Sequence, residues 1–426
     1  MEYLKRALAV PESDLRSVAS TVEELLGSIK SGGQDRVLEL ATKFDGFEGD
    51  PRLGAGALQA LASSGSPELC RDIDAAHARI QRFARAQLAS IRDFEVELEP
   101  GLIAGQRLVP VATAGCYIPG GRYAHIASAL MSITTARVAG VPRVIACTPP
   151  RDGAIDPVMA YAIAKAGADE VLMLGGVQAI GAMAYGIFGS APADLLVGPG
   201  NAYVSEAKRQ LFGGVGIDMF AGPTEILVVA DHTADPELVA QDLVSQAEHG
   251  PDSPAWLVAT DRELASAVLE RVPAHIARLP SPSREAAERA WRTRGEIVVA
   301  ATREEAAAAA DDYAPEHLEV MAADLEWWRA RLRNYGSLFL GPETTVSFGD
   351  KCTGPNHILP TRGAARYTGG LSVHKFLKKL TYQQMTSAAA ARLAPEAARI
   401  CRAEGMEAHA RAVDARAQAS ITKGNS

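Results

Sequence analysis

Short apolar runs recur along the chain between stretches whose apolar residues are spaced three and four apart. The runs are three to five residues long and rich in Val, Leu and Ile, which is typical of buried strands. They fall at 144–147, 171–174, 195–197, 226–230, 256–259, 297–300 and 337–340. Strand, helix, strand repetition predicts an α/β fold with parallel sheets covered by helices on both faces.

Helical patterns dominate both ends of the chain. From Val18 to about Asp93, DRVLELATKFDGF and CRDIDAAHARIQRFARAQLASIRDF show apolar spacing of three and four. From about Tyr367 onward no further strand is evident, and the chain ends in an Ala-rich helical tail. We expect this tail to dock on a partner.

Glycine and proline gather where several predicted strands should end. The loops concerned are CYIPGG, LGGVQAIGA, VGPGNAY, MFAGPTE and GDKCTGPNH. Ligands of open parallel sheets bind beyond the carboxyl ends of the strands, so these loops are the first candidates for a site. GPGNAY holds the first two glycines of a dinucleotide fingerprint, ahead of a predicted helix whose N-terminus could hold phosphate. On the pattern alone, a plain turn is favoured over a cofactor loop.

Composition narrows the class of protein. A chain of 426 residues predicts two or three domains, and 47% apolar with 22% charged residues is typical of a globular protein. A net charge of -8 offers no basic field, so neither nucleic acid nor membrane is expected as a partner. No secretory signal or long apolar run is evident, which favours a cytoplasmic location. The five scattered cysteines, without CxxC spacing, are interpreted as reduced thiols.

Two metal-capable side chains, Gln246 and His249, lie three residues apart near the end of a predicted helix. Asp235 is the expected cap, Pro236 the first helical residue and Gly250 the stop. Residues three apart on a helix are surface neighbours, so one ion could contact both. The alternative, and the commoner role of a lone His beside a helix-ending glycine, is a cap or a packed surface residue.

Further polar residues could complete such a site. Glu316 and His317 place a carboxylate beside an imidazole at a strand mouth, where one could activate water and the other relay a proton; a surface ion pair is the alternative. Asp350 and His357 lie in a glycine-rich loop, and His409 lies on the tail helix, where a solvated face is the ordinary interpretation. A set of Gln246, His249, Asp350 and His409 suits Zn²⁺, and its ligand charge of only about minus one would leave a strong Lewis acid.

Seven motifs, taken in order, closely resemble the histidinol dehydrogenase family over nearly the whole chain. They are CYIPGG, GGVQAIGAMAYG, GPGNAYVSEAKR, AGPTE, SQAEHGPDS, YAPEHL and NHILPT. The resemblance implies a zinc- and NAD-dependent enzyme that oxidises a primary alcohol to a carboxylate in two steps and retains the aldehyde between them. It also implies an intertwined homodimer with a shared active site. By role, the implied residues are the zinc ligands Gln246, His249, Asp350 and, from the other subunit, His409; Glu316 to activate water; His317 to move protons; and Tyr117, Gln178 and Asn201 to contact NAD.

The resemblance further implies two Rossmann-like domains and their limits. Residues 1–115 and 226–366 are expected to form the larger α/β domain with its helical N-terminal region. Residues 116–225 are expected to form a smaller NAD-binding domain, and 367–426 a helical C-terminal tail that docks on the partner subunit.

Several residues depart from the biosynthetic enzymes of this family. Thr224 replaces a serine near the substrate, and the basic residues Arg122, His125, His374 and Lys375 stand where those enzymes lack them. An added cation within about 4–6 Å would cost the ammonium group of histidinol about 1–4 kcal/mol, whereas an anion would gain. The chain is thus similar to the branch that oxidises (R)-2,3-dihydroxypropane-1-sulfonate to sulfolactate. The alternative is that the basic residues lie on a solvated rim.

Two other functions stay open. Glu404 is present at the position that meets the imidazole of histidinol, which favours oxidation of L-histidinol to L-histidine. The third possibility is an inactive relative that binds metal and nucleotide as a scaffold or sensor. Glu316 and His317 argue against it, because a binding module has no need of a water activator.

Overall fold

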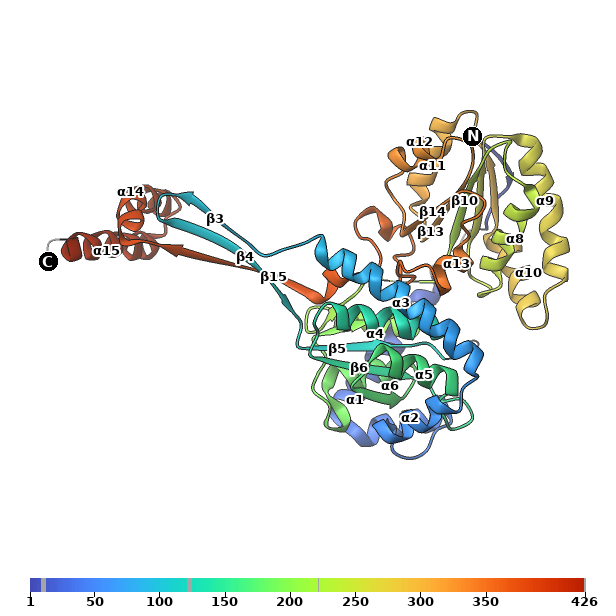
Figure 1. Cartoon of the computed structure of the whole chain (residues 1–426), viewed down its shortest axis with the longest axis horizontal. Coiled ribbons are helices and arrows are strands. Elements are labelled where there is room, and N and C mark those ends of the chain that lie inside the picture. Colours follow the sequence, from blue (N-terminus) through green and yellow to red (C-terminus); the bar gives the residue numbers. More distant parts are fainter. Residues whose placement is uncertain (9–12, 121–124, 221, 425–426) are drawn as a thin grey trace. The chain divides into compact units, whose positions relative to one another are not determined.

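A computed structural model describes residues 1–8, 13–120, 125–220 and 222–424 of the chain (Figure 1). The chain forms two compact units. Unit 1 comprises Met1–Gln87 and Val111–Phe376, and unit 2 comprises Leu88–Pro110 and Leu377–Ser426. Within the described ranges, no helix has the length and apolarity needed to span a membrane.

Unit 1 contains a six-stranded sheet, called sheet A, in the order β1-β12-β11-β10-β13-β14. All its strands are parallel except β1, which pairs antiparallel with β12. The strands are β1 (Glu2–Lys5), β10 (Ile226–Ala230), β11 (Ala255–Ala259), β12 (Glu296–Val299), β13 (His317–Met321) and β14 (Ser337–Leu340). The central strand β10, ILVVA, is buried along its whole length, as a strand covered on both faces must be.

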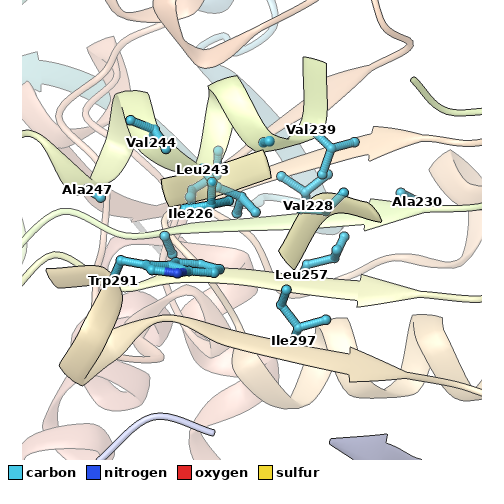
Figure 2. Close-up of a cluster of buried hydrophobic side chains, with 14 of the residues drawn as sticks. Ile226, Val228, Ala230, Val239, Leu243, Val244, Ala247, Leu257, Trp291 and Ile297 are labelled. Carbon is cyan, nitrogen blue, oxygen red and sulfur yellow. The ribbon is translucent and has the colours of Figure 1, made fainter. Parts of the chain in front are cut away.

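Helices cover both faces of sheet A. They are α8 (Pro236–Ala247), α9 (Arg262–Ala277), α10 (Ser283–Arg294), α11 (Arg303–Tyr313), α12 (Leu325–Arg331) and α13 (Val346–Lys351). Side chains of α8, α9 and α10 pack on one face, where Ile226 and Val228 of β10 meet Leu243 of α8 (Figure 2). Side chains of α11 and α12 pack on the other face.

Unit 1 also contains a second six-stranded sheet, called sheet B, in the order β2-β7-β6-β5-β8-β9. Only β2 is antiparallel to its neighbour. The strands are β2 (Arg52–Leu53), β5 (Thr113–Tyr117), β6 (Arg143–Thr148), β7 (Glu170–Met173), β8 (Leu195–Val197) and β9 (Gly216–Ile217).

Helices also surround sheet B. They are α1 (Ser13–Asp45), α2 (Ala55–Ser63), α3 (Pro67–Ala89), α4 (Ile126–Val138), α5 (Pro157–Ala166), α6 (Gly176–Tyr185) and α7 (Ala202–Leu211). Unit 1 also has short 3-10 turns at Ile187–Gly189, Ala364–Arg366 and Val373–Phe376. Side chains of α1, α6 and α7 share one apolar cluster with β5, β6, β7 and β8. Helix α4 is buried almost throughout and packs beside α5.

Unit 2 is an antiparallel three-stranded sheet followed by two helices. The sheet has the order β15-β4-β3, formed by β3 (Phe94–Glu99), β4 (Leu102–Pro110) and β15 (Leu377–Met385). Its helices are α14 (Ser387–Ala403) and α15 (Glu407–Gly424), which pack against each other.

The α/β class predicted from the sequence is confirmed, and so are the seven apolar runs as strands, the N-terminal helices and the helical tail. The expectation that no strand follows Tyr367 is wrong, because β15 pairs with β4. This strand reads LKKLTYQQM and lies mostly exposed, so it lacks the apolar run that marks a buried strand.

The N-terminal elements, which are expected to belong to the larger domain, contact both sheets of unit 1. Only β1 joins sheet A, whereas Val22, Ile29 and Leu40 of α1 pack on sheet B. An amphipathic helix shows that one face is buried without showing against what, so the sequence could not choose between the sheets. The domain limits as such stay a prediction.

Candidate active site

Four polar residues gather at the amino ends of two neighbouring strands of sheet A. Thr224 and Glu225 directly precede β10, and Glu316 directly precedes His317, the first residue of β13. Because Ile226 is in register with His317, the two segments meet side by side. The sequence predicted a site at the carboxyl ends of strands. This cluster lies instead at the amino edge of sheet A, because Glu316 and His317 come before the apolar residues of β13.

Helix α8 ends at the same edge and carries two of the predicted ligands. Asp235 caps its N-terminus by accepting from Glu237 N at 2.8 Å, as predicted, and Pro236 is its first residue. The last turn carries buried Gln246, and His249 follows two residues after the helix. The partial negative charge of a helix C-terminus favours a cation. The local structure thus suits a metal better than an anion.

A chain of hydrogen bonds connects Gln246 with Glu316. Gln246 Nε2 donates to Thr224 Oγ1 at 2.6 Å, and Thr224 Oγ1 donates to Glu316 Oε2 at 2.6 Å. Glu225 N donates to the same Glu316 oxygen at 3.0 Å. The amide nitrogen of Gln246 is therefore committed to Thr224, which leaves its carbonyl oxygen, the harder donor, for a metal.

His317 lies between the two carboxyl groups of the site. Its Nδ1 is 3.0 Å from Glu225 O, which can only accept, so Nδ1 carries a hydrogen in that bond. Its Nε2 is 3.4 Å from Asp350 Oδ1. His317 Nε2 and Asp350 Oδ1 are both buried, and neither makes a hydrogen bond within the described part of the chain. Buried polar atoms without a hydrogen bond are costly, so a group bound here would find two polar atoms available for contact.

Burial and mutual contact shift the pKa values of these groups. Burial raises the pKa of Glu316 to about 7, against the opposing charge of His317. For His317 burial alone would lower the pKa, but the carboxyls of Glu316 and Asp350 outweigh it and raise the pKa to about 9. For Asp350 burial alone would raise the pKa, but contact with His317 holds it well below its ordinary value. Asp350 is therefore an anion at neutral pH.

The predicted ligands within unit 1 fit a divalent metal chemically. Asp350 supplies a charged oxygen and Gln246 a neutral one. Burial among surrounding protein atoms lowers the pKa of His249, so its imidazole is neutral and its lone pair available, although the residue keeps an exposed face in the single chain. One neutral nitrogen and two oxygens are suitable donors for Zn²⁺.

The fourth predicted ligand belongs to unit 2. His409 lies on α15 and Glu404 follows α14, and both are exposed in the single chain. Among residues 1–8, 13–120, 125–220 and 222–424, no three His, Cys, Asp or Glu side chains lie close enough together to hold a metal. The predicted set has only two side chains of these types in unit 1, His249 and Asp350, because Gln246 is an amide and His409 lies in unit 2. The zinc site stays a prediction.

The predicted NAD residues lie at or just beyond the carboxyl edge of sheet B. Tyr117 ends β5, Gln178 lies in the first turn of α6 and Asn201 precedes α7. Asn201 Oδ1 accepts from Tyr203 N at 3.0 Å, so this residue caps the predicted helix. Helix N-termini at this edge favour anions, which suits the pyrophosphate of a dinucleotide.

Two further residues hold these NAD candidates in place. Tyr117 Oη accepts from Gly176 N at 3.2 Å, and Gln178 Nε2 donates to Asp45 Oδ2 at 2.9 Å. Asp45 also accepts from Gly175 N at 3.0 Å. Asp45 could not be found from the sequence, because it is the last residue of a helix and lies 130 positions before Gly175.

The predicted substrate residues fall into three groups. Arg122 lies outside the described residues. His125 begins α4, and its pKa is lowered by burial and by Lys351, while Asp350 opposes both. His374 Nε2 lies 3.3 Å from Gln87 O, and Lys375 Nζ donates to Thr368 Oγ1 at 3.1 Å, so both have partners outside the Asp350 cluster.

Two residues near Asp350 and Glu316 were missed as site residues. Lys351 Nζ lies 3.8 Å from Asp350 Oδ2. Glu225 Oε1 accepts from Arg362 N at 3.1 Å and from Glu316 N at 3.3 Å, and burial, followed by the charge of Glu316, raises the Glu225 pKa to about 8. In the sequence, Lys351 directly follows Asp350 and Glu225 directly follows Thr224, which is the only signal that could have identified them.

A family model described as histidinol dehydrogenase matches residues 8–417. The chain belongs to the histidinol dehydrogenase family. This confirms the resemblance found in the sequence motifs. The family consists of NAD-dependent oxidoreductases that act on CH–OH groups and generally require zinc.

Individual relatives cover nearly the whole chain. A histidinol dehydrogenase homolog of Ruegeria pomeroyi is 56% identical over 97% of this chain and 96% of its own length. A sulfopropanediol 3-dehydrogenase of the same organism is 53% identical over 98% of this chain and 96% of its own. The crystal structure of histidinol dehydrogenase from Elizabethkingia anophelis is similar with a TM-score of 0.88 and 33% identity, covering 98% of both chains.

Proposed function

We propose that this member of the histidinol dehydrogenase family is a zinc- and NAD-dependent dehydrogenase that oxidises a primary alcohol to a carboxylate by way of a retained aldehyde. The observation that carries the proposal is the buried cluster of Glu316, His317 and Asp350. Within the part of the chain that the structure describes, His317 Nε2 and Asp350 Oδ1 make no hydrogen bond and meet only each other, at 3.4 Å. The four-electron outcome needs a proton acceptor and a water activator, and the cluster offers both.

Gln246, His249 and Asp350 would hold the metal, with the partner subunit's His409 as fourth ligand. When bound, Zn²⁺ would supply Lewis acidity toward the alcohol oxygen, and NAD would accept the hydride. Residues Tyr117, Gln178 and Asn201 would hold NAD at the carboxyl edge of sheet B. Thr224 fixes the Gln246 amide through its hydroxyl, so it serves the ligand set without being a ligand.

His317 is assigned the movement of the hydroxyl proton. Its Nδ1 is committed to the carbonyl oxygen of Glu225, so the proton is exchanged at Nε2. His317 is only 2% exposed, which keeps bulk water from competing for that proton. The bond to Glu225 O fixes the orientation of the ring. Because the pKa of His317 is raised to about 9, the fraction of protein whose Nε2 is free to accept the hydroxyl proton grows at alkaline pH.

Glu316 is assigned the activation of water for the second oxidation. Thr224 Oγ1 and Glu225 N both donate to Glu316 Oε2, which leaves Oε1 to accept a proton from water. Burial raises the pKa of Glu316 to about 7, so its carboxylate is a stronger base than an exposed glutamate. Addition of this water to the aldehyde gives the hydrate from which the second hydride leaves.

The proposed substrate is (R)-2,3-dihydroxypropane-1-sulfonate, which yields sulfolactate. In support, Lys351 Nζ lies 3.8 Å from Asp350 Oδ2, and its positive charge would favour an anionic substrate. The 53% identity with a sulfopropanediol 3-dehydrogenase points the same way. L-histidinol is the second candidate, because Glu404 is retained at the position that meets its imidazole.

The purified protein, supplied with Zn²⁺ and NAD at alkaline pH, should be assayed by NADH absorbance with the sulfonate diol and L-histidinol in parallel. We expect two NADH per diol consumed and a higher kcat/KM for the diol. Turnover of histidinol with none of the diol would overturn the substrate assignment. No NADH from a broad alcohol panel would favour the inactive scaffold instead.

A homodimer is proposed from the surface of unit 2. Phe94, Val96 and Leu98 alternate along β3 and are 52%, 43% and 60% exposed in the single chain. Leu380 and Met385 of β15 are exposed as well. Large apolar side chains gathered on a small unit mark an interface, and a second copy of this chain would bring His409 with it.

A further inference from the structure

A buried ion pair in sheet B has no part in the mechanism described so far. Lys208 of α7 and Asp218, which follows β9, lie 2.5 Å apart between Nζ and Oδ1, and their side chains are 2% and 0% exposed. Removing two charges from water is unfavourable, and apolar replacements of similar volume are often as stable. Fold stability is therefore a poor explanation for this pair.

The ion pair holds both polar groups of one glycine. Gly198 N donates to Asp218 Oδ2 at 2.8 Å, and Lys208 Nζ donates to Gly198 O at 2.8 Å. Asp218 Oδ1 also accepts from Met219 N at 2.7 Å. The peptide groups on both sides of Gly198 are thus fixed by a charged clamp at the end of β8, where the GPGN loop begins.

Gly198 in turn lies directly on the backbone of Tyr117. Its φ is +119°, and a Cβ atom at this position would lie 2.0 Å from Tyr117 O, so only glycine fits. Three residues later Asn201 caps α7. The placement of Gly198 therefore sets the spacing between Tyr117 and Asn201, which lie on separate segments at the same edge.

We propose that Lys208 and Asp218 are positioning residues for the dinucleotide, acting through Gly198 on the loop between β8 and α7. The inference rests on the proposed binding of NAD at this edge. Neither residue is assigned a contact with the cofactor. With the clamp in place, the loop is ordered before NAD arrives, and the cofactor does not have to supply the free energy of ordering it.

The test is a titration of NADH fluorescence with the zinc-loaded full-length protein, well below its Tm. The double substitution Lys208→Met and Asp218→Asn removes both charges and leaves neither buried alone. We expect the Kd for NADH to rise about tenfold, since a factor of ten corresponds to about 1.4 kcal/mol of loop ordering. KM for NAD should rise, while zinc content and kcat at saturating NAD stay near the wild-type values.

A matched control removes an ion pair from the other edge of the same sheet. Arg143 and Glu170 begin β6 and β7, and Arg143 Nη2 lies 2.6 Å from Glu170 Oε1. Arg143→Met should leave the Kd for NADH unchanged. A folded double variant whose Kd also equals that of the wild type would overturn the positioning role alone.

Two further outcomes are decisive. A wild-type protein that binds no NADH overturns the cofactor assignment and the positioning role with it.

Should the double variant fail to fold, Lys208→Arg keeps the charge but changes the reach toward Gly198 O. For that variant a rise in Kd of about threefold is expected, because the two head groups are not interchangeable in a fitted site. An unchanged Kd in folded Lys208→Arg would then refute the inference.

Discussion

One hydroxyl group connects the predicted metal ligand with the predicted water activator. Thr224 Oγ1 accepts from Gln246 Nε2 and donates to Glu316 Oε2, with both distances 2.6 Å. The hydroxyl hydrogen can point only one way, so the acceptance from Gln246 fixes the donation to Glu316. The departure from serine at this position keeps the hydroxyl and adds a methyl group, so the polar chain is preserved.

Thr224→Val tests this connection because it replaces the hydroxyl with a methyl of similar size. We expect zinc affinity to fall roughly 10- to 100-fold, as is typical when a group that orients a ligand is lost, and kcat to fall as well. Zinc content by metal analysis and steady-state kinetics measure the two effects. Thr224→Ser is the matched control and should bind zinc like the wild type. Equal affinity in the Val and Ser variants would show that the hydroxyl orients nothing.

Glu316→Gln separates the two oxidation steps. The amide cannot take a proton from water, so the first hydride transfer should persist while the second slows by about 10²- to 10⁴-fold. The NADH formed per alcohol should therefore approach one, and a carbonyl trap should capture the aldehyde. Zinc content should match the wild type. Equal loss of both steps would mean that Glu316 has no special role in water activation.

Opposite edges of two parallel sheets offer opposite electrostatic environments. At the amino edge of sheet A, helix α8 ends beside the Glu316 cluster, whereas at the carboxyl edge of sheet B the helices α6 and α7 begin. Helix C-termini favour cations and helix N-termini favour anions. The direction of the elements alone therefore suits a metal at one edge and a dinucleotide at the other.

Strand β13 and the helices α8 and α13 meet at two carboxyl groups, the buried one of Glu319 and the partly buried one of Asp242. Glu319 of β13 faces Asp242 of α8, and its Oε1 accepts from Val346 N of α13 at 2.7 Å. Thr345 Oγ1 donates to Asp242 Oδ1 at 2.9 Å. Burial raises the pKa of Glu319 well above its ordinary value, and the neighbouring Asp242 raises it further. The raised pKa favours a protonated Glu319 beside the carboxyl of Asp242.

The sign of the resulting pH dependence follows from linkage. Because the folded pKa of Glu319 is raised, its contribution to stability is full below the unfolded pKa and is lost as the pH rises through the folded pKa. Glu319→Gln supplies a permanent donor to Asp242. The Tm of Glu319→Gln minus the Tm of the wild type should therefore increase from pH 4.5 to pH 9. The increase should be roughly 2–4 °C for each kcal/mol of unfolding free energy that the wild type loses as Glu319 gives up its proton.

Thermal scans across this pH range measure the effect. Glu343→Gln, at an exposed position, controls for the loss of one negative charge. If the difference in Tm between Glu319→Gln and the wild type does not change with pH, the folded protein does not hold a proton on Glu319 in this pH range.

The whole molecule is proposed to act as a homodimer in which each site takes His409 from the other subunit. Unit 2 carries this residue together with exposed apolar side chains on β3 and β15. Complementation tests the arrangement directly. A heterodimer of one His409→Ala subunit and one Glu316→Gln subunit would contain one doubly damaged site and one intact site.

We expect each variant alone to form little carboxylate, and co-expression to restore about a quarter of the wild-type rate if subunits pair at random. The measurement is the rate of carboxylate formation from the co-purified mixture. Mixing the separately purified homodimers without exchange is the control and should restore nothing. Absence of recovery in a proven heterodimer would place His409 in its own subunit's site or outside any site.

Elements with continuous apolar runs were predictable from the sequence, and those without were not. Strands β10 and β11 are buried on both faces, so ILVVA and WLVA identify them. Strand β5 is equally buried but reads TAGCY, whose small residues carry no apolar signal. Strand β3, FEVELE, alternates charged and exposed apolar residues, so it resembles a surface segment.

The sequence by itself determined the α/β class, the cap and first residue of α8 and, through the order of seven motifs, the family and its candidate residues. Tertiary structure decided which edge of each sheet these residues share. Contacts of Glu316 with Thr224, of Gln178 with Asp45 and of Gly198 with Tyr117 join positions 81 to 133 residues apart. Local propensity depends on neighbours along the chain, whereas these contacts depend on the order of strands in a sheet, which only the folded chain establishes.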